Sequence, residues 1–174
     1  MFHSDKCIGL LSYKLDATRE ILHTIREMYM NLPECLQFEK KIWNKDCIQF
    51  ANNSKIIIGN CNPNSVRGRS LDLIVVDEAA HISETDFKNF MMSVFPMQAS
   101  RPNSQTIFIT TPKKKDSEFY KLYEHAVARG EECSFNVTHL KWNCIAKRNT
   151  EWKRKMQQYY DVPMFKTEFL AEFV

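Results

Sequence analysis

The chain has 174 residues, of which 44% are hydrophobic and 26% charged, and its formal net charge is +3. These values are typical of one soluble globular domain, and any basic surface must be local because the overall charge is nearly balanced. No apolar run is long enough to span a membrane and no signal peptide is present, so we expect neither a membrane protein nor a secreted one.

The six cysteines do not form a metal-binding or redox motif. No two of them have C-x-x-C spacing, which argues against a zinc ribbon and against a thioredoxin-like pair. We therefore expect buried or free thiols in a reducing cytosol. The cysteines are Cys7, Cys35, Cys47, Cys61, Cys133 and Cys144.

The first 72 residues are predicted to contain strands, one helix and a hairpin. Apolar residues three and four apart predict the helix, which should end before Leu32-Pro33 because the residue before a proline avoids helical geometry. The predicted elements are a strand at Cys7–Ser12, a helix at Asp16–Met30, a turn at Trp43–Asp46, a hairpin of Cys47–Ala51 and Lys55–Gly59 around Asn52–Ser54, and a loop at Asn60–Ser70.

Strands and helices alternate from residue 73 onward. This alternation predicts an α/β fold whose mostly parallel sheet is built from βαβ units and flanked by helices. Ser83 and Asp86 form a variant capping box, Pro96 should end the helix that they begin, and Gly130 should end the next one. The predicted elements are strands at Leu73–Val76, Gln105–Thr110 and Ser134–Leu140, and helices at Ser83–Phe95, Asp116–Arg129, Asn149–Tyr160 and Met164–Phe173, the last two separated by Pro163.

Two adjacent carboxylates, Asp77 and Glu78, follow the apolar run Leu73–Val76. Such a run suits a parallel strand buried on both faces, and in an open α/β sheet ligands bind beyond the carboxyl ends of the strands. The pattern has the form of a Walker B motif, in which Asp77 would hold Mg²⁺ through water and Glu78 would deprotonate the water that attacks a γ-phosphate. A solvated acidic turn is the structural alternative.

Thr110, Thr111 and Arg67 are further candidate site residues. The threonines end the next strand, where hydroxyls could sense a γ-phosphate, although threonine also commonly ends strands without such a role. Arg67 could stabilise transition-state charge on a phosphate, or it could be a surface residue paired with Asp72 or Asp86.

A run of basic residues follows the predicted strand Gln105–Thr110. Lys113, Lys114 and Lys115 could contact a DNA backbone, but lysine runs are more often solvated surfaces. His81 lies beside the carboxylates without a second histidine at metal-binding spacing, so we expect a polar loop residue there.

These pieces together resemble the ATPase domain of the terminase large subunit, the DNA-packaging motor of tailed bacteriophages. The resemblance rests on Val66-Arg67-Gly68, on LIVVDEAA at Leu73–Ala80, and on IFITTP at Ile107–Pro112, followed by a helix that contains Phe119-Tyr120. It runs through nearly the whole chain, and the last stretch, Phe165–Phe173, resembles the linker to the family's nuclease domain.

The resemblance implies a role for each candidate residue. Asp77 would be the Mg²⁺-associated Walker B aspartate, and Glu78 would be the catalytic base. Thr110 and Thr111 would belong to the motif that couples hydrolysis to movement. Arg67 falls where some members have an arginine finger that acts on the neighbouring subunit of a ring.

The resemblance also implies a P-loop NTPase fold of the ASCE class, with ATP as substrate and Mg²⁺ as cofactor, in the cytoplasm of the infected host cell. The implied partners are double-stranded viral DNA, the portal ring, the terminase small subunit and further copies of the chain in a ring. We expect a partial ATPase core at residues 1–143 and a linker or lid of helices at 144–174.

The sequence departs from the family pattern ahead of Cys7–Ser12. The family's Walker A motif lies there, and this sequence contains no G-x-x-x-x-G-K-[ST] and no nuclease domain. We therefore expect an ATPase core that is incomplete at its N-terminus, needs a polypeptide supplying Walker A and does not hydrolyse ATP alone. Strand Gln105–Thr110 should then have a neighbour on one side only. The alternatives are another nucleic-acid translocase or helicase, and a non-catalytic fragment that docks onto partners.

Overall fold

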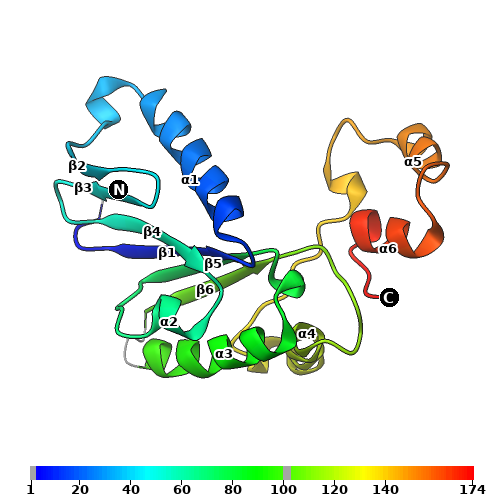
Figure 1. Ribbon diagram of the computed structural model, residues 1–174. Coiled ribbons are helices and arrows are strands. Elements are labelled where there is room, and N and C mark those ends of the chain that lie inside the picture. The colour runs from blue at the N-terminus through cyan, green and yellow to red at the C-terminus, as the bar shows by residue number, and fades with distance from the viewer. Residues whose placement is uncertain (1–2, 100–102) are drawn as a thin grey trace. The chain divides into compact units, whose positions relative to one another are not determined.

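The computed structural model describes residues 3–99 and 103–174 (Figure 1). The chain divides into two compact units, Met1–Ile109 and Thr110–Val174. The sheet belongs to the first unit, whereas the second consists of helices and extended segments. Among the described residues, every helix falls short of the length and hydrophobicity that a membrane crossing requires.

The first unit contains the strands and helices that were predicted between Cys7 and Ile109, with two additions. Its strands are β1 (Cys7–Ser12), β2 (Lys40–Trp43), β3 (Cys47–Phe50), β4 (Lys55–Asn60), β5 (Leu73–Asp77) and β6 (Gln105–Ile109). Its helices are α1 (Leu15–Met30), α2 (Pro63–Val66) and α3 (Glu84–Ala99). The additions are β2 and the short α2, which lies inside the predicted loop.

The strands form one sheet in the order β2-β3-β4-β1-β5-β6. The pairs β4–β1, β1–β5 and β5–β6 are parallel, whereas β2–β3 and β3–β4 are antiparallel, so the sheet is mixed. The predicted α/β class is confirmed, and the prediction of a mostly parallel sheet holds only for the half from β4 to β6. Strand β2 was missed because three of its four side chains are exposed, which leaves no apolar period to detect.

Helix α1 covers one face of the sheet over β1 and β4 (Figure 1). Tyr29 of α1 lies between two other rings, with centroid distances of 5.2 Å to Trp43 and 5.2 Å to Phe50. Its hydroxyl donates a hydrogen bond of 2.6 Å to the carbonyl of Phe38. The buried side chains of this core are Leu10, Leu22, Tyr29, Ile48 and Phe50. This packing holds β1, and therefore the carboxyl end of β1, in place.

Helix α3 covers the opposite face (Figure 1). The rings of Phe87 on α3 and Phe108 on β6 lie 5.8 Å apart, and Phe90 and Val94 of α3 are fully buried. Because Val76 pairs with Phe108 in parallel register, Val76 points to this same face. Helix α3 therefore buries the side of β5 that carries Ile74 and Val76, whereas the side that carries Leu73 and Val75 is half-buried.

The ends of α3 test two sequence signals. The predicted cap is confirmed, since the Ser83 hydroxyl accepts a hydrogen bond of 3.2 Å from the Asp86 backbone N–H. The predicted end at Pro96 is wrong, because the helix continues to Ala99. Pro96 is exposed and lies in the last turn, where a proline removes a hydrogen bond at the end of the helix but does not divide it.

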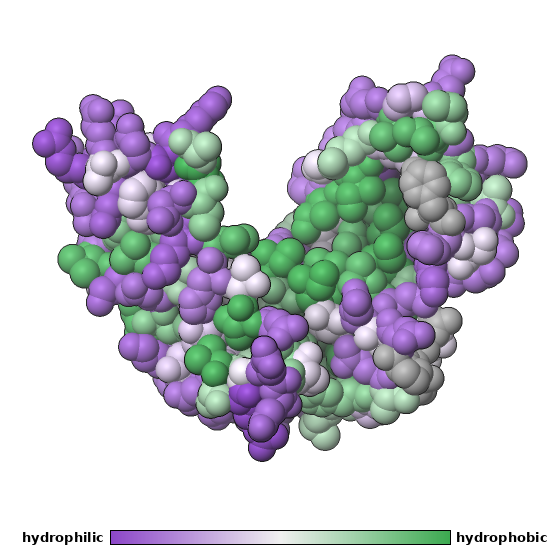
Figure 2. Space-filling model, turned by 180° about the vertical axis from the view of Figure 1, so that it is seen from behind, coloured by the Kyte–Doolittle hydropathy of each residue, from purple (hydrophilic) through white to green (hydrophobic). Residues whose placement is uncertain are grey.

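Strand β6 lies at the edge of the described sheet and pairs with β5 alone, as expected. Ile107 and Ile109 are 45% and 52% exposed, because α1 packs over β1 and β4 rather than over this edge. Figure 2 shows hydrophobic side chains, coloured green, gathered at the foot of the lobe that carries α1. An exposed apolar edge strand favours aggregation or capture of another strand.

The second unit has three helices among its described residues: α4 (Glu118–Arg129), α5 (Thr150–Met156) and α6 (Val162–Leu170). Each helix begins after a residue whose side chain accepts a backbone hydrogen bond, namely Ser117, Asn149 and Asp161. Gly130 follows α4 with a φ of 52°, as the sequence predicts. Pro163 does not separate two helices but lies in the first turn of α6, where no helical hydrogen bond is lost.

The strand predicted at Ser134–Leu140 is wrong. This segment has no regular secondary structure and no place in the described sheet, and Leu140 is 75% exposed. Alternating apolar residues form a strand only where a neighbouring strand accepts their backbone hydrogen bonds. The extended C-terminus has such a partner instead, since the N–H of Val174 donates to the Lys113 carbonyl and the N–H of Lys115 to the Val174 carbonyl.

All six cysteines are free, and the most protected thiol is that of Cys61. Burial raises its pKa from 9.0 to about 12. At pH 8 we expect Cys61 to react with a thiol reagent far more slowly than the exposed Cys35, and both to react equally fast after denaturation. Mass spectrometry of the alkylated chain checks this result. Because the folded pKa is raised, the contribution of Cys61 to stability is complete below pH 9 and is lost as the pH rises toward 12.

Candidate active site

The carboxyl ends of β1, β5 and β6 lie side by side in the sheet, and Asp77 lies at the middle one. Ser12 at the end of β1 pairs with Asp77 at the end of β5, and Asp77 pairs with Ile109 at the end of β6. Residues in parallel register point to the same face, so the Ser12 and Asp77 side chains are neighbours. This is the edge of an α/β sheet where ligands bind.

Asp77 suits a magnesium ion that keeps most of its water. Its side chain is half-buried at the strand end, and among residues 3–99 and 103–174 no three His, Cys, Asp or Glu side chains gather as a metal site. Mg²⁺ typically takes one or two carboxylates and fills its other positions with water and phosphate oxygens. The donors present fit such an ion and do not fit a metal held by protein ligands alone.

Ser12 was missed by the sequence analysis. Its side chain is fully buried, and its hydroxyl has no hydrogen-bond partner within the part of the chain that the structure describes. Burying a hydroxyl without a hydrogen-bond partner costs about 1–3 kcal/mol of folding free energy. This hydroxyl lies beside Asp77, so it is a further candidate site group. Its location at the end of the strand next to β5 could have been read from the sequence, had the strand order been known.

Glu78 has an unusual backbone conformation. Its φ and ψ are 52° and 44°, in the left-handed region, which costs a non-glycine residue about 1–2 kcal/mol. A 3₁₀ turn, Ala79–His81, follows directly, and the His81 backbone N–H donates a hydrogen bond of 2.9 Å to the Glu78 carbonyl. The sharp turn takes the chain away from β5 and keeps Glu78 at the strand end.

The Glu78 carboxylate is only partly exposed. One oxygen, Oε2, is buried and accepts no hydrogen bond from the described part of the chain, and a near neighbour is His81 Nε2 at 3.6 Å. This separation is in the range of an ion pair when the imidazole is protonated, and it is too long for a hydrogen bond. The side chain as a whole is 38% exposed, so its exposed area lies on atoms other than Oε2.

Thr110 and Thr111 follow β6 directly and are the first residues of the second unit. The Thr110 hydroxyl donates a hydrogen bond of 2.9 Å to the Thr111 carbonyl. Because Ile109 pairs with Asp77, the chain leaves the sheet beside the carboxylates at this point. The roles predicted for these threonines stay predictions.

Arg67 makes a contact that the sequence did not predict. Its Nε donates a hydrogen bond of 3.2 Å to the Ser93 hydroxyl on α3, rather than pairing with Asp72 or Asp86. Asp72 instead bonds Lys6 Nζ at 3.1 Å and the Cys7 backbone N–H at 2.8 Å. Arg67 is exposed just after α2, so its guanidinium is accessible to another molecule.

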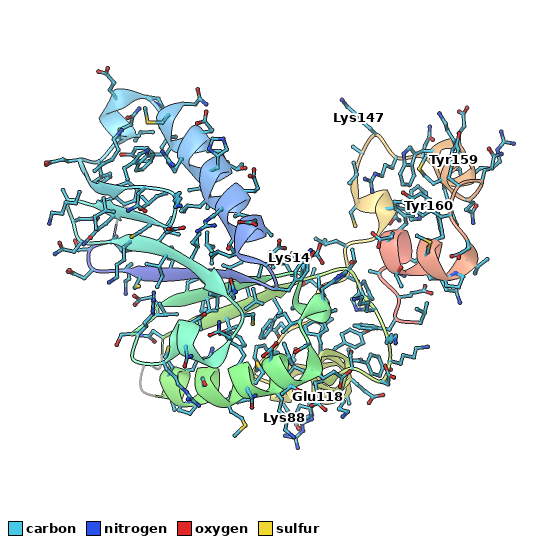
Figure 3. The ribbon with its side chains drawn as sticks, in the orientation of Figure 1. Lys14, Lys88, Glu118, Lys147, Tyr159 and Tyr160 are labelled. Carbon is cyan, nitrogen blue, oxygen red and sulfur yellow. The ribbon has the colours of Figure 1, made fainter. Side chains whose placement is uncertain are left out.

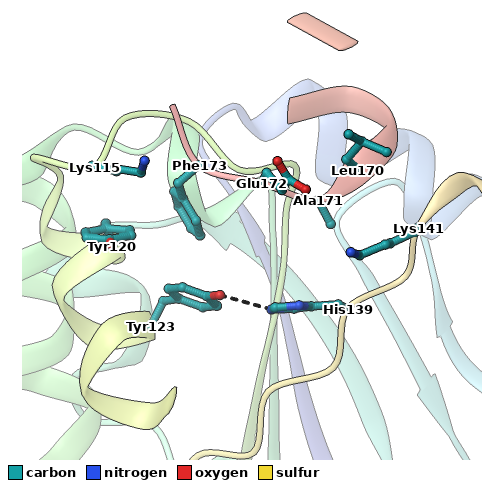
Figure 4. Close-up of a pocket in the computed structure, with 9 residues that line it drawn as sticks. All are labelled: Lys115, Tyr120, Tyr123, His139, Lys141, Leu170, Ala171, Glu172 and Phe173. Atoms are coloured by element: carbon teal, nitrogen blue, oxygen red, sulfur yellow. Dashed lines mark hydrogen bonds between the residues drawn. The ribbon is translucent and has the colours of Figure 1, made fainter. Parts of the chain in front are cut away.

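The three lysines of the predicted DNA contact, Lys113, Lys114 and Lys115, are exposed at the start of the second unit. Lys115 also lines an open hollow of about 350 Å³ in this unit (Figure 4). Within it, the Tyr123 hydroxyl and His139 Nε2 lie 3.1 Å apart, and the Tyr123 and Phe173 rings lie 4.7 Å apart. The hollow is therefore lined both by α4 and by the C-terminal residues.

Three solved structures of similar fold are phage large terminases. An ATPase-domain mutant of the Thermus phage P74-26 large terminase has 20% identity and a TM-score of 0.72, over 98% of this chain and 78% of that chain. The large terminase of a thermophilic bacteriophage, in complex with ADP, has 15% identity and a TM-score of 0.73, over 98% of this chain and 41% of that chain. The HK97 bacteriophage large terminase has 13% identity and a TM-score of 0.66, over 98% and 40%.

At these identities the solved structures establish the fold alone, and the chain spans only 41% and 40% of the last two proteins. The family comes from the sequence. Residues 1–173 match the family described as terminase large subunit, T4likevirus-type, N-terminal. This match covers nearly the whole chain and agrees with the fold. The chain therefore belongs to the terminase large subunit family and corresponds to its N-terminal, ATPase region.

Proposed function

We propose that this chain supplies the hydrolytic carboxylates of a motor that uses ATP to move double-stranded DNA into a viral procapsid. The observation that carries the proposal is the pair Asp77 and Glu78 at the carboxyl end of β5, flanked in register by β1 and β6. A strand end with two carboxylates is suited to Mg²⁺-assisted phosphoryl transfer.

Each residue has a separate task in this proposal. Asp77 holds the water shell of Mg²⁺, which neutralises charge on the β- and γ-phosphates when it is bound. Glu78 orients the attacking water and accepts its proton. Thr110 and Thr111 respond to the γ-phosphate and link its loss to movement of the chain that follows β6. One similar terminase was solved in complex with ADP, which supports nucleotide binding by this chain.

The partners follow from the family. We propose that copies of the chain form a ring that works with the portal ring, the terminase small subunit and viral DNA in the host cytoplasm. A phosphate-binding Walker A segment is required, because carboxylates alone do not bind an anionic nucleotide well. Lys113, Lys114 and Lys115 contact the DNA backbone, and residues 144–174 serve as the linker or lid after an ATPase core at 1–143.

A metal-dependence experiment tests the proposal. Asp77→Asn in a reconstituted packaging motor should raise the Mg²⁺ concentration needed for half-maximal hydrolysis and lower the maximal rate, since the amide attracts the hydrated cation more weakly. Asp72→Asn is a matched control, because Asp72 precedes the same strand and bonds Lys6 and Cys7. Equal Mg²⁺ dependence of wild type and Asp77→Asn would contradict the proposed role of Asp77.

Arg67→Ala should lower turnover in the assembled ring more than it lowers nucleotide affinity, because an arginine finger acts on transition-state charge. Removing an arginine finger typically costs about a thousandfold to a hundred-thousandfold in kcat. Rings that mix Arg67→Ala with Glu78→Gln subunits should recover part of the activity if Arg67 acts across an interface. Ser93→Ala is the control for the intramolecular bond of Arg67. Mixed rings with no activity at any ratio would argue against a role in trans.

One observation favours the non-catalytic alternative. The exposed apolar side of β6 suits a fragment whose task is to dock onto a partner. A titration of the purified chain with a fluorescent ATP analogue, alone and with a Walker A polypeptide, separates the two functions. Binding that appears with that polypeptide supports the motor, whereas no binding in either case supports docking.

A further inference from the structure

The contacts of His81 carry an inference about how Glu78 is held. In the turn that follows β5, the backbone bond from the His81 N–H to the Glu78 carbonyl places these residues one above the other, as residues three apart are in a 3₁₀ turn. Their side chains meet as a result, with His81 Nε2 3.6 Å from Glu78 Oε2.

Tyr13 is a second neighbour of the His81 imidazole. It follows Ser12 at the end of β1, and its ring lies 5.8 Å from that of His81 at an interplanar angle of 43°. Lys14 Nζ lies over the Tyr13 ring at 5.1 Å, near the point where β1 leads into α1 (Figure 3). The imidazole therefore lies near both an aromatic ring that directly follows β1 and a carboxylate that directly follows β5, and these strands are adjacent in the sheet.

The Glu78 carboxylate has little else to orient it. Oε2 is shielded from solvent and accepts no hydrogen bond from residues 3–99 or 103–174, so His81 is the polar group placed to satisfy it. The left-handed backbone sets the direction in which the Glu78 side chain leaves the main chain, and His81 sets the position of one carboxylate oxygen. Catalytic contacts that are long in a ligand-free enzyme often shorten when substrate binds.

We propose that His81 is a positioning residue for Glu78, which it holds by Oε2 so that the other carboxylate oxygen is presented to the attacking water. The inference rests on the proposed role of Glu78 as the base. His81 touches no substrate in this arrangement, and it acts by limiting the rotamers of the base. Tyr13 contacts His81, so it acts indirectly, by limiting the rotamers of His81.

The kinetic test compares His81→Ala with His81→Gln in the reconstituted motor. Displacing a catalytic group by about 1 Å can cost about a hundredfold, so His81→Ala should lower kcat by about tenfold to a hundredfold. The KM for ATP should change less than twofold, because His81 does not contact nucleotide. His81→Gln keeps an N–H donor near Oε2 and should recover part of the loss, which a role in packing alone does not predict. Wild-type kcat in a folded His81→Ala variant would overturn the inference.

A second readout needs no activity. In the purified chain, the imidazole resonances of His81, identified by their loss in His81→Gln, should move on Glu78→Gln and on Tyr13→Leu. They should not move on Glu84→Gln, which removes an exposed carboxylate at the start of α3. Resonances that do not respond to Glu78→Gln would overturn the contact itself.

The two tests also separate this inference from the proposed function. If Glu78→Gln retains hydrolysis, Glu78 is not the base and both ideas fail. If Glu78→Gln is inactive while His81→Ala turns over at the wild-type rate, only the inference fails. A kcat loss in His81→Ala, rescue by His81→Gln and a resonance shift on Glu78→Gln together support it.

Discussion

Glu78→Gln should abolish ATP hydrolysis in the reconstituted motor while nucleotide affinity changes little. The amide keeps the shape of the side chain and cannot accept the proton of the attacking water. Removing a general base typically costs about a hundredfold to ten-thousandfold in rate, so residual hydrolysis should be close to the detection limit. Single-turnover hydrolysis of radiolabelled ATP and a separate equilibrium binding assay give the two quantities.

The matched control for this variant is Glu84→Gln. Glu84 is an exposed carboxylate in the first turn of α3, and its substitution by Gln removes the same charge. It should hydrolyse ATP at the wild-type rate. If Glu78→Gln hydrolyses within a few-fold of wild type, another group is the base and the function of this strand end must be reassigned.

Phe90→Ala should destabilise the first unit more than any surface change. Phe90 is fully buried on α3, and truncating a buried phenylalanine costs about 3–5 kcal/mol of unfolding free energy. That loss is comparable with the whole stability of many domains. Urea denaturation followed by tryptophan fluorescence should show a lower midpoint or an unfolded chain in the absence of urea.

Met92→Ala is the control on the same helix, because Met92 is 64% exposed and two residues from Phe90. Its midpoint should stay close to that of wild type, since surface substitutions are usually within about 0.5 kcal/mol. Equal midpoints for the two variants would mean that α3 does not form the core of the first unit.

The parallel strands were predictable because their apolar runs leave a signal in the sequence. The apolar runs of β1 and β5 mark strands directly, and the carboxylates after β5 point to the site. Strand β2 has mostly exposed side chains, so only its pairing with β3 defines it. The same dependence on a partner explains why Ser134–Leu140 alternates and yet forms no strand.

The candidate site likewise contains some residues that could be predicted from the sequence and others that could not. Asp77 and Glu78 could be proposed from the sequence because two carboxylates directly after an apolar run form a recognisable pattern. Ser12 and Tyr13 were not, since their closeness to the carboxylates depends on β1 pairing with β5 across about sixty residues. The contact of His81 with Glu78 depends on the left-handed backbone conformation of Glu78, and no pattern in the sequence predicts that positive φ.

The place of β1 in the sheet sets a constraint on how the chain folds during synthesis. β1 comes earliest in the chain among the strands of the described sheet, yet its two neighbours are β4 and β5, which end at Asn60 and Asp77. The ribosome must therefore complete β5 before β1 is paired on both edges, while the antiparallel β2, β3 and β4 can associate earlier through short connections. Contacts distant in the sequence form slowly, and a chain with an unpaired central strand is prone to aggregate. Chaperone demand should thus be greatest in the interval between the release of β1 and the arrival of β5.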